Sequence, residues 1–266
     1  MSSTTETPSF EALLATAHAL ADRAAEVILP HFRKPGVVDH KGGQVFNPVT
    51  AADRDAETAI RQIIAERYPD HGILGEEFGT SRTDADYCWV VDPIDGTSAF
   101  IIGQPIWGCL IGLMRDGEPV LGLMDQPFTE ERFWSGETQA YYRHDDVQPI
   151  RTRTCPSLAE AMLASTGPDL FAPGDELARF EGLSRAVKLT RFGGDCYNYC
   201  LLALGQLDLV VEAGLNPFDI IPLIPIVTRA GGVVSRWDGG DAKAGGRIVA
   251  AGDPHLHALA VNALSG

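Results

Sequence analysis

The segment that most restricts the fold covers residues 90–100, which read VVDPIDGTSAF. Its apolar start predicts a buried strand, and the Asp, Pro and Gly residues that follow predict a turn. Pro93 fixes the backbone between Asp92 and Asp95, so both carboxylates are expected to stay together at the end of that strand. An isolated segment of this kind is usually just a strand that enters a turn, so the rest of the chain must decide whether the two carboxylates act together.

The composition limits the class of protein. The chain has 266 residues, enough for one large domain or two small ones, and 45% of them are hydrophobic. Its formal net charge is −15, which argues against nucleic acid or an anionic membrane surface as a partner. A small anionic substrate is compatible with this charge where bound cations reverse the local field.

The N-terminus and the cysteines predict a compartment. The first ten residues, MSSTTETPSF, have neither a basic start nor an apolar core, so we expect no signal peptide. No apolar run approaches the roughly 18 residues that a membrane span needs. The five cysteines form no C-x-x-C pair, which is typical of small buried side chains in a reducing compartment. We therefore expect a cytoplasmic protein.

Hydrophobic periodicity predicts an α+β first half. One helix is expected over residues 10–30, and a second begins after Thr50, its predicted N-cap. Short apolar runs over residues 89–134 predict strands, and Asp116-Gly117 predicts a hairpin turn between two of them.

The second half predicts an α/β arrangement. Strands alternate with helices after about residue 147, and helices are expected over residues 195–204 and 217–230. Pro225 lies inside the last of these and should kink it. We place a boundary near residue 145, which divides the chain into 1–145 and 146–266.

Further acidic residues stand in short motifs outside the central segment. They are Asp53 in NPVTAADRD, Glu76 and Glu77 in ILGEEFG, and Glu212 and Asp219 in VVEAGLNPFD. Some have ordinary explanations, since Asp53 and Asp219 could each complete a capping box and the glutamates could form a solvated turn. Carboxylates that cluster would repel one another unless cations held them, and Mg²⁺ prefers oxygen ligands of this type.

The order of these motifs resembles the inositol monophosphatase superfamily over almost the whole chain. The matching motifs are G-E-E, D-P-I-D-G-T and a later E-x-x-x-x-x-x-D. The resemblance implies a layered α/β/α/β/α sandwich of the inositol monophosphatase and fructose-1,6-bisphosphatase type. It also implies a homodimer and a Mg²⁺-dependent phosphomonoesterase with lithium as an inhibitor.

The resemblance assigns metal ligands residue by residue. Glu76, Asp92 and the main-chain carbonyl of Ile94 would bind a first ion. Asp92, Asp95 and Asp219 would bind a second, and a third ion is compatible with the family pattern. Two ions can hold the attacking and leaving oxygens of an in-line displacement, so the turn around Pro93 would serve to bring its ligands together.

The resemblance also implies catalytic and phosphate-binding roles. The catalytic residues are then Thr97, Asp53 and Glu76. Asp53 would pair with Thr97 and position a further metal ion or the attacking water. The amides of Gly96 and Thr97 would receive the phosphate, since glycine allows close approach of the backbone. Glu77 would support the site without binding metal.

A later run resembles the histidinol-phosphatase branch of the superfamily. It reads GDCYNYCLLA and is followed by VVEAGLNPFD. The resemblance places Asp195 and Glu212 near the substrate, where they would suit the ammonium and imidazole groups of histidinol phosphate. Alternatively, Asp195 is only the N-cap of a helix and Glu212 a solvated residue at a strand end.

The leading functional prediction is hydrolysis of L-histidinol phosphate to L-histidinol and phosphate by metal-activated water, a step of histidine biosynthesis. The alternatives are a phosphatase for inositol 1-phosphate or another small phosphate ester, and a non-catalytic binding or scaffold protein.

Several residues depart from the superfamily pattern. Ser98 stands where related sequences often have Lys or Arg, Phe218 where they usually have Trp, and Pro222 and Pro225 lie inside a predicted helix. These departures leave the metal ligands intact but weaken the substrate assignment. Residues 41–43, Lys-Gly-Gly, are either a flap that carries a catalytic metal or a plain exposed loop.

Overall fold

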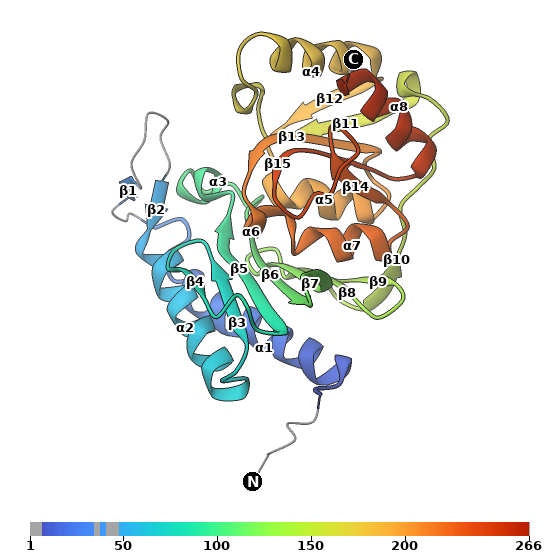
Figure 1. Ribbon diagram of the computed structural model, residues 1–266. Helices are drawn as coiled ribbons and strands as arrows, with labels where there is room; N and C mark the ends of the chain where they lie inside the picture. Colours follow the sequence, from blue (N-terminus) through green and yellow to red (C-terminus); the bar gives the residue numbers. More distant parts are fainter. Residues whose placement is uncertain (1–6, 35–37, 41–47, 266) are drawn as a thin grey trace.

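The computed structural model describes residues 7–34, 38–40 and 48–265 of the chain. Within these ranges two large sheets alternate with three groups of helices (Figure 1). Helices α1 and α2 cover the outer face of the larger sheet, α5, α6 and α7 lie between the sheets, and α4 and α8 cover the outer face of the smaller sheet. The predicted layered α/β/α/β/α sandwich is confirmed.

The larger sheet has eight strands and is antiparallel except where β3 pairs with β5. In order across the sheet the strands are β10 (Val147–Ile150), β9 (Ala140–Arg143), β8 (Glu131–Ser135), β7 (Glu118–Gln126), β6 (Gly108–Arg115), β5 (Tyr87–Asp95), β3 (Gly72–Gly75) and β4 (Gly79–Ser81). Asp116 and Gly117 both have positive φ in the two-residue turn between β6 and β7, as the predicted hairpin requires.

The smaller sheet is mixed and belongs entirely to the second half. In order across it the strands are β12 (Leu189–Phe192), β11 (Met162–Ser165), β13 (Leu209–Leu215), β15 (Gly246–Ala251) and β14 (Val233–Arg236). The short strands β1 (Val38–His40) and β2 (Pro48–Thr50) form a separate antiparallel pair.

Four helices begin where the sequence predicts, at residue 10, after Thr50, at residue 195 and at residue 217. The helices of the described residues are α1 (Phe10–Ile28), α2 (Ala51–Arg67), α3 (Thr97–Ile101), α4 (Asp175–Ala186), α5 (Asp195–Ala203), α6 (Pro217–Ile220), α7 (Leu223–Arg229) and α8 (Pro254–Ser265). The Ser9 hydroxyl accepts the Ala12 amide at the start of α1, and Thr50 caps α2 through a capping box. Among the described residues no helix combines the length and hydropathy that a bilayer span requires.

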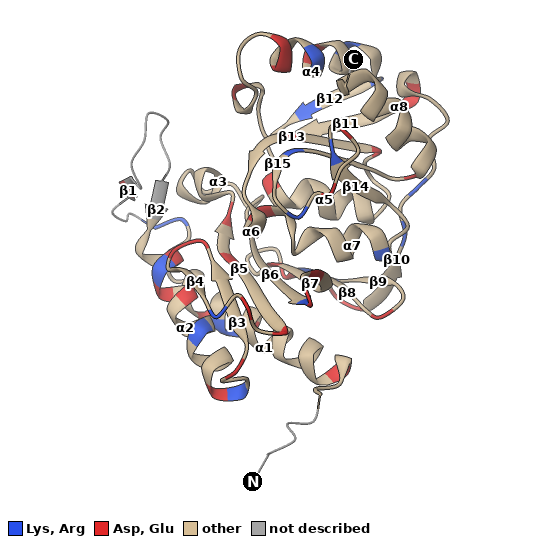
Figure 2. Ribbon diagram, in the orientation of Figure 1, with Lys and Arg blue, Asp and Glu red and all other residues tan. Residues whose placement is uncertain are grey.

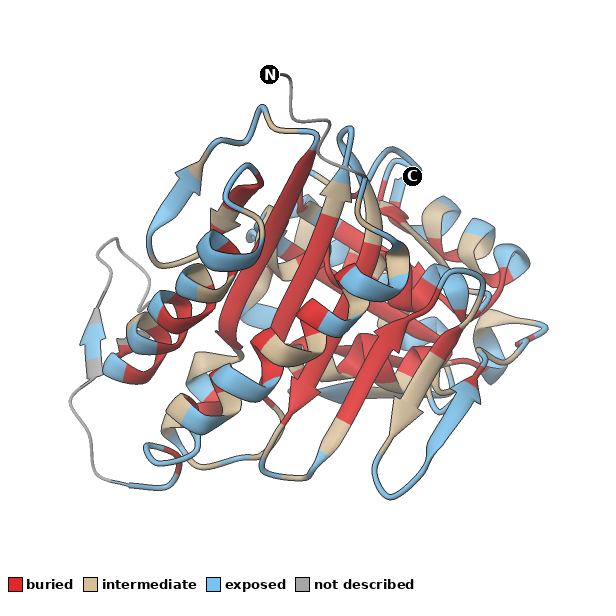
Figure 3. Ribbon diagram, turned by 90° about the horizontal axis from the view of Figure 1, so that it is seen from below, coloured by how far each residue is buried: buried red, intermediate tan, exposed pale blue. Residues whose placement is uncertain are grey.

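Apolar burial holds the layers together. The central strands are buried along most of their length, and each covering helix has one buried side (Figure 3). Trp89 of β5 and Leu20 of α1 are fully buried in the cluster between the larger sheet and its outer helices. Full burial of an aliphatic side chain such as Leu20 contributes about 1.5–3 kcal/mol, so α1 is held firmly against the sheet.

The helix predicted over residues 217–230 is two helices, and the expected kink at Pro225 is wrong. Pro222 cannot donate a helical hydrogen bond, so α6 ends and α7 begins around it. Pro225 is the third residue of α7, where a backbone N–H has no helical partner to lose.

The break between α6 and α7 sits on two glycines of the larger sheet. Gly112 of β6 pairs with Gly122 of β7, and both face Pro222. A Cβ on Gly122 would collide with the Pro222 carbonyl oxygen, and one on Gly112 would lie 3.2 Å from the Pro222 ring. The paired glycines thus form a depression that lets α6 lie close to the sheet.

The two halves share a core between the sheets. Leu110 and Met124 of the larger sheet, Ile226 of α7 and Val210 of the smaller sheet belong to one buried cluster. The chain passes from one sheet to the other between β10 and β11. The boundary near residue 145 stays a prediction.

Candidate active site

The end of β5 bends so that its two aspartates face the same region. Asp92 pairs with Leu110 of β6, whereas Asp95 pairs with Gly108, so one extra residue of β5 forms a bulge. Pro93 stands in this bulge, where its missing N–H breaks no ladder hydrogen bond. The Ile94 amide donates to Asp92 Oδ1 over 3.1 Å and fixes that carboxylate within the bend.

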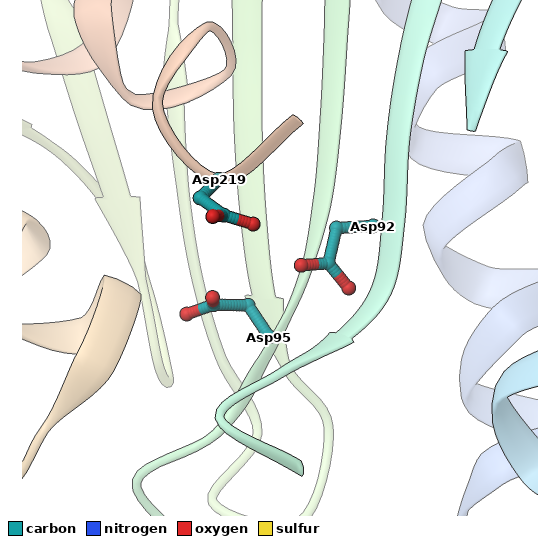
Figure 4. A group of neighbouring side chains, drawn as sticks. All are labelled: Asp92, Asp95 and Asp219. Atoms are coloured by element: carbon teal, nitrogen blue, oxygen red, sulfur yellow. The ribbon is translucent and has the colours of Figure 1, made fainter. Parts of the chain in front are cut away.

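Asp219 meets these two aspartates from the opposite layer (Figure 4). Carboxylate oxygens of Asp92, Asp95 and Asp219 all lie within 4.8 Å of one another. The Asn216 amide donates to Asp219 Oδ2 over 2.7 Å, so Asp219 completes the predicted capping box of α6 and also faces β5. The capping and the functional interpretations of Asp219 are therefore compatible.

The cluster is costly to ionise in the protein alone. Burial, followed by the charges of Glu76, Asp95 and Asp219, raises the pKa of Asp92 well above its usual range. Burial and the charges of Asp195 and Asp219 raise the pKa of Asp95 in the same way. Figure 2 shows acidic segments gathered where β5 approaches α6. Carboxylates crowded in this way need protons or a cation, and their oxygens suit Mg²⁺.

Glu76 lies beside the aspartates in the turn after β3. Its amide donates to the Val91 carbonyl of β5 over 3.1 Å. The Glu76 charge also contributes to the raised pKa values of Asp92 and Asp53. The structure thus brings the G-E-E motif and the D-P-I-D-G-T motif together, as a shared site requires.

Asp53 is fully buried at the start of α2. The Thr50 amide and hydroxyl donate to Asp53 Oδ2 over 2.8 and 2.6 Å, so the alternative capping role is real. Burial raises the pKa of Asp53, and its Oδ1 has no hydrogen-bond partner within the part of the chain that the structure describes. The Thr97 hydroxyl donates to the Ile94 carbonyl over 3.0 Å. The expected pairing of Asp53 with Thr97 stays a prediction.

Gly96 and Thr97 form the turn where α3 begins. Gly96 is the N-cap and has φ 82°, a left-handed conformation that favours glycine. A Cβ on Gly96 would lie 3.1 Å from the Asp195 carboxylate, so glycine also allows Asp195 to approach the turn. Phosphate binding by these two amides stays a prediction.

Asp195 is not the cap of α5. Gly194 occupies the N-cap position, and Asp195 is the first helical residue with φ 43°. The next amide, of Cys196, donates to Asp95 Oδ2 over 2.7 Å and ties the start of α5 to the end of β5. Burial raises the pKa of Asp195 to about 6. The helix-cap alternative for Asp195 is therefore wrong.

Glu212 is buried on β13 and is not a solvated strand end. The Thr166 amide and hydroxyl donate to its Oε1 over 2.9 and 3.0 Å, while Oε2 has no hydrogen-bond partner among the described residues. Burial first, and then the charges of Asp195 and Asp219, raise the pKa of Glu212 to about 8. Near the acidic cluster, Glu212 is thus buried and Asp195 is partly buried.

Sequence analysis missed two polar residues of this region. Thr166 contacts Glu212, as described, and Glu57 of α2 accepts the Glu77 amide over 2.7 Å. Neither residue stands in a recognisable motif. The only signal for Glu57 is Arg61 one helical turn later.

The structure also locates residues that depart from the superfamily pattern. Ser98 is exposed on α3, and Phe218 is partly buried beside Asp219. Residues 41–43, the proposed flap, lie outside the described residues.

Comparison with known proteins agrees with this geometry. The family model for the inositol monophosphatase family matches residues 10–265. The chain belongs to this family. A solved inositol monophosphatase from Zymomonas mobilis superposes with a TM-score of 0.87 and is 42% identical, with 98% of this chain and 100% of that chain covered.

Two curated relatives show the same membership. The chloroplastic bifunctional phosphatase IMPL2 of Arabidopsis thaliana is 42% identical over 261 residues, or 94% of this chain and 74% of the relative. A histidinol-phosphatase of Mycobacterium tuberculosis is 36% identical over 241 residues, or 89% of this chain and 92% of the relative. The chain is accordingly a phosphoric monoester hydrolase of the inositol monophosphatase family.

Proposed function

We propose that this phosphatase depends on Mg²⁺ and hydrolyses L-histidinol phosphate to L-histidinol and phosphate. The observation that supports a metal site is the set of three carboxylates whose oxygens lie within 4.8 Å of one another at the end of β5. Asp92, Asp95 and Asp219 would hold the ions, together with Glu76 and the Ile94 carbonyl. Mg²⁺, when bound, supplies an activated water and neutralises charge on the phosphoryl group.

The size of the required acceleration supports a metal. Hydrolysis of phosphate monoesters requires up to about 10²¹-fold acceleration. A single positioned acid or base supplies roughly 10²- to 10⁴-fold. Side chains that only transfer protons are therefore far too weak, and a non-catalytic scaffold would have no need of so costly a carboxylate cluster.

The chain's own residues would bind the phosphate and orient the water. The amides of Gly96 and Thr97 would bind the phosphoryl oxygens, since Gly96 keeps that turn open to close approach. The buried Asp53 Oδ1 has no hydrogen-bond partner within residues 7–34, 38–40 and 48–265, and it would accept a proton from the Thr97 hydroxyl or from the water.

Two acids near the cluster support a cationic substrate. Asp195 begins α5 and Glu212 lies on β13, and histidinol phosphate carries an ammonium and an imidazole. One charge-assisted hydrogen bond contributes about 1.5–3 kcal/mol, or roughly 10- to 150-fold in preference. The similarity to a protein named histidinol-phosphatase supports the same substrate.

Inositol 1-phosphate is the second candidate. Glu212 and Thr166 together offer an acceptor and a hydroxyl, which also suit the hydroxyl groups of a sugar-like ester. The similarity to a structure named inositol monophosphatase supports this alternative.

A comparison of three substrates tests the proposal. Phosphate release is measured with Mg²⁺ on histidinol phosphate, inositol 1-phosphate and glycerol phosphate, for the parent and for Asp195→Asn. We expect Asp195→Asn to lower kcat/KM for histidinol phosphate by an amount equivalent to about 1–3 kcal/mol of transition-state stabilisation. The kcat/KM for glycerol phosphate should change little. The matched control is Asp175→Asn, since Asp175 is also the first residue of a helix after a glycine but is exposed.

The possible results distinguish an error in the substrate assignment from an error in the metal chemistry. An unchanged ratio between the two esters in Asp195→Asn would remove Asp195 from substrate recognition. A parent enzyme that prefers inositol 1-phosphate would overturn the histidinol-phosphatase assignment and leave the metal chemistry in place.

Three further proposals accompany this function. A cytoplasmic location is supported by five cysteines that are all unpaired. Family membership supports a homodimer and inhibition by lithium as proposals. Light scattering on the purified protein tests the homodimer, and an activity titration with LiCl tests the inhibition.

A further inference from the structure

Glu57 makes an unusual set of contacts for a glutamate in the middle of a helix. Its side chain is fully buried in α2. Its Oε2 accepts the Glu77 amide over 2.7 Å, and its Oε1 accepts the Phe78 amide over 3.3 Å. Arg61, one turn later, donates its Nε to the same Oε1 over 2.7 Å. A single carboxylate therefore binds two consecutive main-chain amides and one guanidinium.

These contacts hold the turn that carries Glu76. On one side of this turn the Glu76 amide bonds to Val91 of β5, and on the other the following two amides bond to Glu57 of α2. Gly75 is needed for this arrangement, because a Cβ there would collide with the Glu57 carboxylate. Glu76 is thus placed between a fixed strand and a fixed helix.

We propose that Glu57 is a positioning residue that sets the affinity of the site for Mg²⁺ by fixing the main chain of the Glu76 turn. The inference rests on the proposed function, in which Glu76 is a metal ligand. Residues that orient metal ligands without touching the metal typically change metal affinity by about 10- to 100-fold when they are replaced.

The chemistry requires a carboxylate at this position. Both oxygens of Glu57 accept from N–H donors. In Glu57→Gln, either orientation of the amide would set an NH₂ group against a main-chain N–H or the Arg61 guanidinium, so one side of the turn would be released. Glu57→Gln keeps the size of the side chain, which separates this effect from the loss of buried volume.

The experiment measures Mg²⁺ binding to the metal-free full-length protein by calorimetry, without substrate. It compares the parent, Glu57→Gln and the matched control Glu66→Gln, an exposed glutamate of the same helix. We expect the Mg²⁺ dissociation constant to rise at least tenfold in Glu57→Gln and to stay within twofold in Glu66→Gln. At saturating Mg²⁺, kcat of Glu57→Gln should recover to within about threefold of the parent.

Each result supports or overturns the proposal. An unchanged Mg²⁺ dissociation constant in a folded Glu57→Gln variant would show that Glu57 is only structural. A parent that binds no Mg²⁺ would overturn the proposed function itself, which is a different failure. If Glu57→Gln does not fold, Arg61→Gln replaces it, since Arg61 is partly exposed and holds the same carboxylate. A severalfold weaker affinity in Arg61→Gln then supports the proposal, and no change refutes it.

Discussion

Replacing Asp92 with Asn should stabilise the metal-free protein while removing its response to Mg²⁺. Asp92 is 2% exposed and lies beside the carboxylates of Asp95 and Asp219. Asn retains the Oδ1 that accepts the Ile94 amide, so the local hydrogen bond survives. The substitution therefore removes a charge and changes little else.

The expected gain follows from the spacing of the carboxylates. Two unit charges 4.8 Å apart, the limit that encloses these oxygens, repel by about 3.5 kcal/mol at an effective dielectric constant of about 20. Uptake of a proton relieves part of this cost, since burial and the neighbouring charges already raise the pKa of Asp92. We therefore expect Asp92→Asn to gain about 1–3 kcal/mol in EDTA, or about 2–12 °C in the unfolding midpoint.

Excess Mg²⁺ should reverse the order of stability of the parent and Asp92→Asn. A ligand at 100 times its dissociation constant stabilises the parent by about 2.7 kcal/mol. Asp92→Asn should gain little from Mg²⁺ and should lose its phosphatase activity, since Asp92 is expected to contact both ions. Thermal unfolding by circular dichroism, in EDTA and in excess MgCl₂, measures both effects on the same samples.

A second buried aspartate provides the control. Asp125 is also buried, but the Arg132 guanidinium donates to it over 2.6 Å. Breaking such a pair costs about 3–5 kcal/mol, so Asp125→Asn should destabilise the protein in EDTA and keep the Mg²⁺ response. The reasoning fails if Asp92→Asn is destabilised in EDTA, or if it retains activity in Mg²⁺ within about tenfold of the parent, equivalent to about 1.4 kcal/mol.

Three further substitutions test other parts of the site. Thr97→Ala should lower kcat and kcat/KM together, because its hydroxyl is expected to orient water in the transition state, and a change confined to KM would refute that role. Burial raises the pKa of Glu212 to about 8, so the metal-free parent should lose stability as pH rises from the unfolded pKa near 4.5 to about 8. Glu212→Gln should remove up to about 5 kcal/mol of this dependence, which urea unfolding in EDTA can follow, and equal slopes in both proteins would contradict the burial argument. Gly122→Ala should push α6 from the sheet, because the new Cβ would collide with the Pro222 carbonyl. Calorimetry should then show weaker Mg²⁺ binding in Gly122→Ala than in Gly112→Ala, and equal effects of the two substitutions would count against the glycine depression.

The sequence predicts the parts of this structure that depend on neighbouring residues. Thr50 with Asp53, and Asn216 with Asp219, form the capping boxes that their spacing indicates. The bend after Val91 is expected from the Asp, Pro and Gly residues that follow it. Helix α8 could also have been predicted, since Asp253 accepts the amides of residues 255 and 256 and Pro254 follows it directly.

The parts that escaped prediction depend on contacts between distant segments. Glu57 acquires its role through amides 20 and 21 residues later in the chain, and Thr166 through Glu212, 46 residues away. The break at Pro222 is favoured by two glycines on strands about 100 residues earlier. Periodicity and local propensity carry no information on such pairs, so they predict a single helix with a kink at Pro225 over residues 217–230.

The core shared between the sheets has a consequence for synthesis of the protein. Every strand of the larger sheet precedes residue 151, so this sheet can leave the ribosome before α5, α6 and α7 exist. Its inner face, which includes Leu110, Met124 and Phe133, then has no cover. The three-aspartate cluster of the site also stays incomplete until Asp219 is made.

A nascent chain therefore passes through a stage in which one side of its first sheet is apolar and open. Chaperone binding at this stage would protect the face until the later helices close it. A fragment that ends at residue 150 is expected to self-associate through Leu110, Met124 and Phe133 instead of persisting as a folded monomer.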